Sequence, residues 1–154
     1  HTLLTQHALF SDSHELGRDT CLQLLLSALI EPHIGLDQPL FIYDYPASQA
    51  ALAKIRQDEY PVAERFELYY QGLELANGFH ELNDRAEQTT RFENDQQQRL
   101  TQHKVVPAMD KKFLACLDTL PDCAGVAIGI DRLLMLKLAT NNIRDVISFS
   151  WDYL

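Results

Sequence analysis

The stretch RFELYYQGLELANGFHEL, Arg65 to Leu82, decides the fold. Aromatic and aliphatic residues alternate with polar ones on both sides of Gln71-Gly72, which predicts two antiparallel strands joined by a two-residue turn. Asn77-Gly78 interrupts the second strand and predicts a β-bulge at that point.

The remaining elements are predicted by working outward from this hairpin. Asp84, with its carboxylate near a helix N-terminus, marks the start of a polar helix. Helices and strands alternate irregularly around an antiparallel hairpin, so the fold class is α+β, with an antiparallel β-sheet flanked by helices. Helices are expected over 16–30, 48–55, 84–103, 110–120 and 131–139, and further strands over 40–43, 123–130 and 146–149.

The composition narrows the class of protein. The chain has 154 residues, 46% of them apolar, which excludes a fully disordered chain. No apolar run approaches the roughly 20 residues of a membrane helix, so no membrane partner is expected. The net charge of −9 disfavours generic binding to nucleic acid. Three cysteines without a C-x-x-C pair favour reduced thiols and hence a cytoplasmic protein.

Two glutamates of the hairpin form the first candidate site. If Gln71-Gly72 is the loop, Tyr69 lies opposite Glu74, and Glu67 shares the face of Tyr69. The two carboxylates then form a diagonal pair, roughly 7–8 Å apart at the backbone. Such a pair suits Mg²⁺, which takes one or two carboxylates together with substrate phosphates. The alternative is that both glutamates point into solvent, and two glutamates alone favour that alternative.

A second candidate follows on the same strand. Asn77-Gly78 and Glu81 offer an amide and a carboxylate, four residues apart, that can bind the polar ends of a small ligand. The alternative is a turn asparagine with a surface glutamate.

The third candidate is GVAIGIDRLLML, Gly125 to Leu136. Gly125, Ala127 and Gly129 fall on one strand face with almost no side chain, which lets a planar ring approach closely. Arg132 follows on an apolar helix, where its guanidinium can stack on a purine or pair with a phosphate. The alternative is tight packing of helix on sheet with a surface arginine.

Together with IRDVISFSWD, these segments resemble the C-terminal half of the catalytic domain of class II lysyl-tRNA synthetases, from about residue 39 to 149. The string E-x-A-N-G-x-x-E-L-N-D is specific, and the small-residue strand ending in Arg132 is similar to class II motif 3. The resemblance implies an antiparallel sheet and the activation of an amino acid by ATP to an aminoacyl-adenylate.

The resemblance also implies roles for individual residues. Glu67 and Glu74 match the carboxylates that bind Mg²⁺ and ATP, and Asn77 matches the position near the amino-acid carboxylate. Glu81 matches the acid that pairs with the lysine side-chain ammonium, and Arg132 matches the arginine that stacks on adenine and contacts the γ-phosphate. The predicted site therefore comprises Glu74 and Arg132 as catalytic residues, Asn77, Gly78, Glu81 and Ala127 for substrate, Glu67, Glu74, Gly125, Gly129 and Arg132 for ATP, and Glu67 and Glu74 for Mg²⁺.

Departures from the synthetase pattern indicate the branch. Lysyl-tRNA synthetases usually have glycine at Ala127 and Ser-Pro-Leu-Ala-Lys at 50–54, where this chain reads AALAK. PASQAALA and NGFHEL resemble instead the stand-alone paralogues that join (R)-β-lysine to a lysine of elongation factor P. This branch implies elongation factor P and lysine or (R)-β-lysine as partners, and it makes tRNA an unexpected one.

Two class II motifs are expected to be absent. Motif 1, which usually builds the homodimer, and motif 2, which grips the α-phosphate, have no convincing match; Arg65-Phe66-Glu67 resembles motif 2 only superficially. The chain is therefore expected to be a single domain, 1–154, forming the C-terminal part of a catalytic domain and inactive alone. The alternatives are a lysyl-tRNA synthetase fragment that charges tRNA with lysine and a non-enzymatic binding module.

Overall fold

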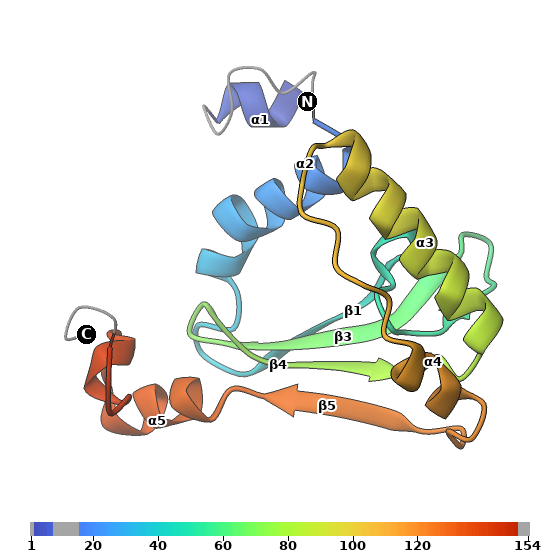
Figure 1. Ribbon diagram of the computed structural model, residues 1–154. Coiled ribbons are helices and arrows are strands. Elements are labelled where there is room, and N and C mark those ends of the chain that lie inside the picture. The colour runs from blue at the N-terminus through green and yellow to red at the C-terminus, as the bar shows by residue number, and fades with distance from the viewer. Residues whose placement is uncertain (1, 8–15, 151–154) are drawn as a thin grey trace.

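A computed structural model describes residues 2–7 and 16–150 (Figure 1). Its centre is an antiparallel sheet in the order β1-β3-β4-β5, with the short β2 paired to β3. The predicted α+β class is confirmed, and Trp151 of the matched C-terminal segment lies outside the described residues. The strands are β1 (Leu40–Pro46), β2 (Ile55–Arg56), β3 (Val62–Tyr70), β4 (Leu73–His80) and β5 (Ala124–Ile128).

The predicted hairpin is formed by β3 and β4. Tyr70 lies opposite Leu73 and Tyr69 opposite Glu74, as the turn at 71–72 requires. Gln71 and Gly72 have φ values of 51° and 71°. Positive φ at both central positions is the type I′ geometry, whose twist matches that of the flanking strands.

The bulge lies elsewhere than predicted. Asn77 and Gly78 pair regularly with β3, and the register shifts instead between the pairs on either side of Leu75. Leu75 is therefore the extra residue of β4. In a regular strand, side chains three residues apart point to opposite faces, so the bulge is what brings Glu74 and Asn77 to one face.

Most of the predicted helices are present. Asp84 caps α3 as predicted, since its side chain accepts a hydrogen bond of 3.0 Å from the Glu87 N–H, and Asp110 caps α4 in the same way. The helices are α1 (Thr2–Gln6), α2 (Arg18–Leu25), η2 (Leu26–Ile30), η3 (Glu31–His33), η4 (Ala47–Gln49), α3 (Arg85–Thr101), α4 (Lys111–Leu117), α5 (Ile130–Leu138) and η5 (Ile143–Asp145).

Two predicted elements are wrong. Residues 48–55 do not form a helix, because after η4 the chain pairs with the sheet through the Ala53–Glu81 bridge and β2. Residues 146–149 do not form a strand, and Phe149 is largely exposed. In the described part of the chain β5 is the edge strand of the sheet, and residues 146–149 do not pair with it.

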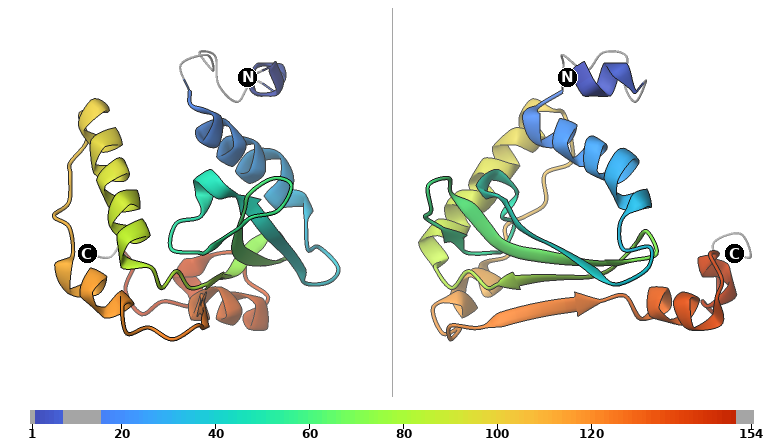
Figure 2. Two further views of the ribbon diagram at one scale, coloured as in Figure 1. Left: turned by 90° about the vertical axis from the view of Figure 1, so that its right-hand side faces the viewer. Right: turned by 180° about the vertical axis from the view of Figure 1, so that it is seen from behind.

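The helices leave much of the sheet accessible. In both Figure 1 and Figure 2, α2 and α3 rise on the same side of the sheet, α4 lies near the start of β5, and α5 continues beyond its end. A core cluster of Tyr45, Ala50, Ala53 and Ala63 packs where the 47–55 segment meets β1 and β3. Within the described residues, every helix is too short or too polar to span a lipid bilayer.

Candidate active site

One face of the sheet gathers most of the predicted residues. Glu67 pairs with Asn77, and Asn77 pairs with Ala127, so three neighbouring strands contribute to this face. We call it the site face. By strand alternation it carries Arg65, Glu67 and Tyr69 of β3, Glu74, Asn77 and Phe79 of β4, and Gly125 and Ala127 of β5.

Glu67 is the most enclosed charged side chain of this face, with 6% of its surface exposed. The hydroxyls of Tyr45 and Tyr69 each donate to its Oε2 at 2.6 Å. The Arg65 guanidinium donates to Oε1. A buried carboxylate needs such partners, because an unpaired one is costly to desolvate.

Arg65 connects Glu67 to other residues of this site, and the sequence analysis did not predict it as a site residue. Its Nε donates to Asn77 Oδ1 at 3.3 Å and its Nη1 to the carbonyl of Gln49 at 3.2 Å. Its guanidinium carbon lies 4.5 Å from the ring centroid of Tyr45 and 5.9 Å from that of Phe79. The signal available in the sequence was the alternation Arg65, Glu67, Tyr69, which places all three on one face.

The two tyrosines act as hydrogen-bond donors. Burial, reinforced by the hydrogen bond to Glu67, raises the pKa of Tyr45 and of Tyr69 far above the usual value. Both phenols are therefore protonated throughout the physiological range. They hold the Glu67 carboxylate in place and are not available as general bases.

Arg132 of α5 contacts Glu74 through its guanidinium group. Its Nη1 donates to the Glu74 carbonyl and lies 3.5 Å from Glu74 Oε2. Gly129 precedes α5 as its N-cap, and its N–H donates to the carbonyl of the bulge residue Leu75 at 2.9 Å. The bulge thus fixes both Glu74 and the start of the helix that carries Arg132.

Gly125 makes room for Glu81. A Cβ at Gly125 would lie 2.3 Å from Glu81 Oε1, so the carboxylate occupies the space that any side chain would fill. Gly78, predicted to bind substrate, does not join these residues on the site face. A Cβ there would lie 2.4 Å from the Phe66 ring, and Phe66 is its partner on β3. The missing side chain of Gly78 serves packing on the opposite face.

The two predicted metal carboxylates differ in how available they are to a metal ion. Glu67 already accepts from two hydroxyls and a guanidinium, so Mg²⁺ would compete with Arg65 for its carboxylate. Glu74 is partly exposed, with its side chain 35% accessible, and has a carboxylate available to an ion. Among the described residues no group of three or more His, Cys, Asp or Glu is placed to hold a metal.

The site face opens into two hollows on either side of Glu74. The first lies between α2, η3 and the sheet, and includes Gln23, Glu31, Tyr45, Arg65, Glu67 and Glu74. The second is lined by Glu74, Leu75, Ala76, Asn77, Ala127, Ile128, Gly129 and Arg132.

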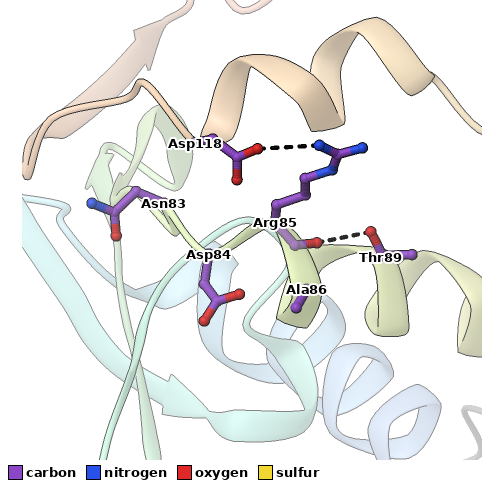
Figure 3. A pocket seen from close by; sticks show the side chains of 6 residues that line it. All are labelled: Asn83, Asp84, Arg85, Ala86, Thr89 and Asp118. Carbon is purple, nitrogen blue, oxygen red and sulfur yellow. Dashed lines mark hydrogen bonds and ion pairs between the residues drawn. The ribbon is translucent and has the colours of Figure 1, made fainter.

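A separate hollow lies where α3 begins (Figure 3). Figure 3 shows the Arg85 guanidinium directed toward Asp118 of the segment after α4, at 3.1 Å. Thr89 donates to the Arg85 carbonyl at 2.8 Å. The Arg85–Asp118 contact links α3 to the end of α4, and none of the predicted site residues lies there.

Comparison with known proteins defines the family. A sequence model of the tRNA synthetases class II (D, K and N) matches residues 26–152, most of the chain. The chain therefore belongs to this family, in agreement with the resemblance and with the antiparallel sheet.

The curated relatives indicate a particular branch. The elongation factor P–(R)-β-lysine ligase of Proteus mirabilis is 54% identical over 140 residues, which are 90% of this chain and 43% of the relative. The ligases of the same name from Salmonella gallinarum and Klebsiella pneumoniae are 53% and 52% identical over 143 residues, 92% of this chain and 44% of each relative. The chain thus spans less than half the length of these relatives.

Proposed function

We propose that the complete protein containing these residues activates (R)-β-lysine with ATP and joins it to a lysine of elongation factor P. The observation that carries the proposal is the connected set of charged groups on the site face, where Arg132 meets Glu74, and Arg65 joins Glu67 to Asn77. The curated names of relatives at 52–54% identity support the choice of substrate and acceptor.

Most of the predicted residues have a role in this proposal. Glu81, seated beside Gly125, binds an ammonium group of the lysine-type substrate, and Asn77 lies near its carboxylate. Arg132 binds the nucleotide against the small residues Ala127 and Gly129. Glu74 would hold Mg²⁺, which would supply positive charge to neutralise the phosphates of ATP.

The proposed reaction has two steps. The substrate carboxylate attacks the α-phosphorus of ATP, pyrophosphate leaves, and an adenylate forms. The deprotonated amine of the acceptor lysine then attacks the acyl carbon of the adenylate, and AMP leaves. The protein contributes by positioning these groups and by stabilising charge.

Ala127 is the proposed specificity position. Ala127 pairs with Asn77, so its methyl group lies on the site face next to the proposed substrate position. Lysyl-tRNA synthetases usually have glycine at this position. One methyl group changes discrimination by about 1–3 kcal/mol. It therefore tunes the choice between α- and β-lysine without setting it alone.

We further propose that the chain forms the C-terminal part of the catalytic domain, with motif 3 ending at Arg132 and with motifs 1 and 2 supplied by the rest of the complete protein. The relatives, of which the chain spans 43–44%, support this division. By the same resemblance, the complete protein is a homodimer.

The deciding experiment is ATP–pyrophosphate exchange by the complete protein, with (R)-β-lysine and α-lysine assayed side by side. Preference for β-lysine is expected, and Ala127→Gly should shift the ratio toward α-lysine by about tenfold or more. Val126→Ala, on the same strand but the opposite face, is the matched control. Preference for α-lysine would support a lysyl-tRNA synthetase, and no exchange with either would support a binding module.

A further inference from the structure

Outside the site face, His80 at the end of β4 is held between two carboxylates. Its Nδ1 lies 2.6 Å from Glu64 Oε2 and its Nε2 lies 2.8 Å from Asp122 Oδ1. Carboxylates only accept hydrogen bonds, so both contacts are satisfied together only when both ring nitrogens carry protons. The arrangement therefore selects the imidazolium form.

The surrounding charges complete a small network. Lys54 pairs with Asp122, and Arg56 Nη1 lies 3.6 Å from Glu64 Oε1. The hydrogen bonds to Asp122 and Glu64 raise the pKa of His80, although the positive charge of Lys54 opposes them. Arg56 in turn pairs with Asp44 and Asp58, so its charge is shared.

This network is adjacent to the two segments that contact the Glu81 backbone. The Glu81 N–H donates to the carbonyl of Cys123 at 2.9 Å, and Glu81 forms a β-bridge with Ala53. Cys123 directly follows Asp122, and Ala53 directly precedes Lys54. The Lys54 N–H also donates to the His80 carbonyl at 2.8 Å. The two neighbours that position the Glu81 backbone are therefore each one residue away from a partner in the network.

We propose that His80 is a positioning residue for the lysine-type substrate: by bridging Glu64 of β3 and Asp122 of the segment before β5, the protonated imidazole fixes the place of Glu81. The inference rests on the proposed function in one respect, namely that Glu81 binds the substrate ammonium group. His80 itself lies on the opposite face and contacts no substrate.

The pH dependence follows from the direction of the shift. A histidine whose folded-state pKa is raised contributes fully below its usual pKa, and its contribution is lost as the pH rises through the raised value. Substrate binding is therefore tightest while His80 is charged and weakens above that range.

The test measures KM for (R)-β-lysine in ATP–pyrophosphate exchange across pH 6–9 with the complete protein. His80→Gln should raise KM about three- to tenfold at the acid end, the scale of one or two charge-assisted hydrogen bonds at a partly exposed site. The difference between variant and wild type should vanish as the pH rises, with kcat changed less than about twofold. His103→Gln, at an exposed histidine after α3, is the matched control and should follow the wild-type curve.

Titration of the substrate amines is common to all three proteins and cancels in this comparison. Equal KM values for wild type and His80→Gln at every pH would overturn the inference.

A second measurement does not depend on activity. In NMR titrations of the complete protein, the amide signals of Glu81 and Gly125 should follow the same midpoint as the His80 ring, and they should lose that transition in His80→Gln. Signals that ignore the His80 titration would overturn the positioning role. Absence of exchange together with a coupled titration would instead reject the proposed function and leave the positioning of Glu81 by His80 supported.

Discussion

At the scale of single residues, Arg65 is the side chain on which the site geometry depends most directly. Arg65→Lys keeps the positive charge but loses the planar fork that reaches Glu67, Asn77 and the Gln49 carbonyl together. We expect the free energy of unfolding to fall by about 1.5–3 kcal/mol, the usual contribution of hydrogen bonds to charged groups. Urea denaturation of the complete protein measures this change, and exchange activity should fall with it.

The control for Arg65→Lys is Arg99→Lys on α3. Arg99 pairs with Asp95 one helical turn away, and both side chains are exposed. Such a pair contributes only about 0.3–0.5 kcal/mol, so the control should leave both unfolding and exchange near wild type. Equal effects of the two substitutions would show that Arg65 is not a central contact.

How far the site could be predicted also depends on individual residues. The pairing of Tyr69 with Glu74 followed from the turn, because a two-residue loop fixes the register. Tyr45 could not be placed on Glu67 in this way, since β1 is irregular between Tyr43 and Tyr45 and local pattern does not reveal such a shift. Hydrogen bonds between strands that are distant in sequence can be predicted only when the register of those strands is already known.

At the scale of elements, β5 matters because it presents small residues to the site face. Gly125→Ala places a methyl group 2.3 Å from the present position of Glu81 Oε1. The end of a flexible side chain can move away, so we expect the stability to change by less than about 1 kcal/mol. The displaced carboxylate should nevertheless raise KM for (R)-β-lysine by about tenfold or more in ATP–pyrophosphate exchange.

Gly78→Ala on the adjacent strand should show the reverse pattern. Its Cβ would meet the Phe66 ring at 2.4 Å and the Gly125 carbonyl at 2.9 Å, and backbone cannot move aside as a carboxylate can. Overpacking of this kind costs about 1–3 kcal/mol. Thermal unfolding should therefore report a loss of stability at Gly78→Ala, with KM near wild type; similar profiles for the two variants would contradict the assignment of their faces.

The elements that the sequence misassigned are those decided by tertiary pairing. Residues 48–55 have helix-favouring alanines, but Ala50 and Ala53 are buried in the core cluster and the chain is drawn into the sheet. Residues 84–103 were predicted correctly because Asp84 caps the helix locally. Local signals were sufficient where local contacts dominate, as in capped helices and the tight turn.

At the scale of the whole molecule, the face opposite the site carries an exposed apolar patch. Phe41 and Tyr43 of β1 are 56% and 69% exposed, and Val126 and Ile128 of β5 are 54% and 51% exposed. These four side chains share that face by the register of the sheet. Exposed apolar patches and open strand edges promote association.

The 154 residues expressed alone should therefore self-associate and show no lysine-dependent ATP–pyrophosphate exchange. Light scattering after gel filtration measures the first property, and replacing Val126 and Ile128 by lysine should reduce association, because charge on an exposed sheet face opposes it. Tyr60→Lys, at another exposed aromatic residue outside this face, controls for the added charge.

The proposed division of the site predicts that activity can be recovered by supplying the rest of the catalytic domain. The curated relatives are more than twice as long as the segment that they share with this chain. Mixing the chain with the complementary N-terminal part of the Proteus mirabilis ligase should restore exchange, since the missing phosphate-binding groups would then be supplied in trans. Exchange by the isolated monomeric chain would contradict the proposed division, because it would require Arg65, Glu74 and Arg132 to complete the reaction without those groups.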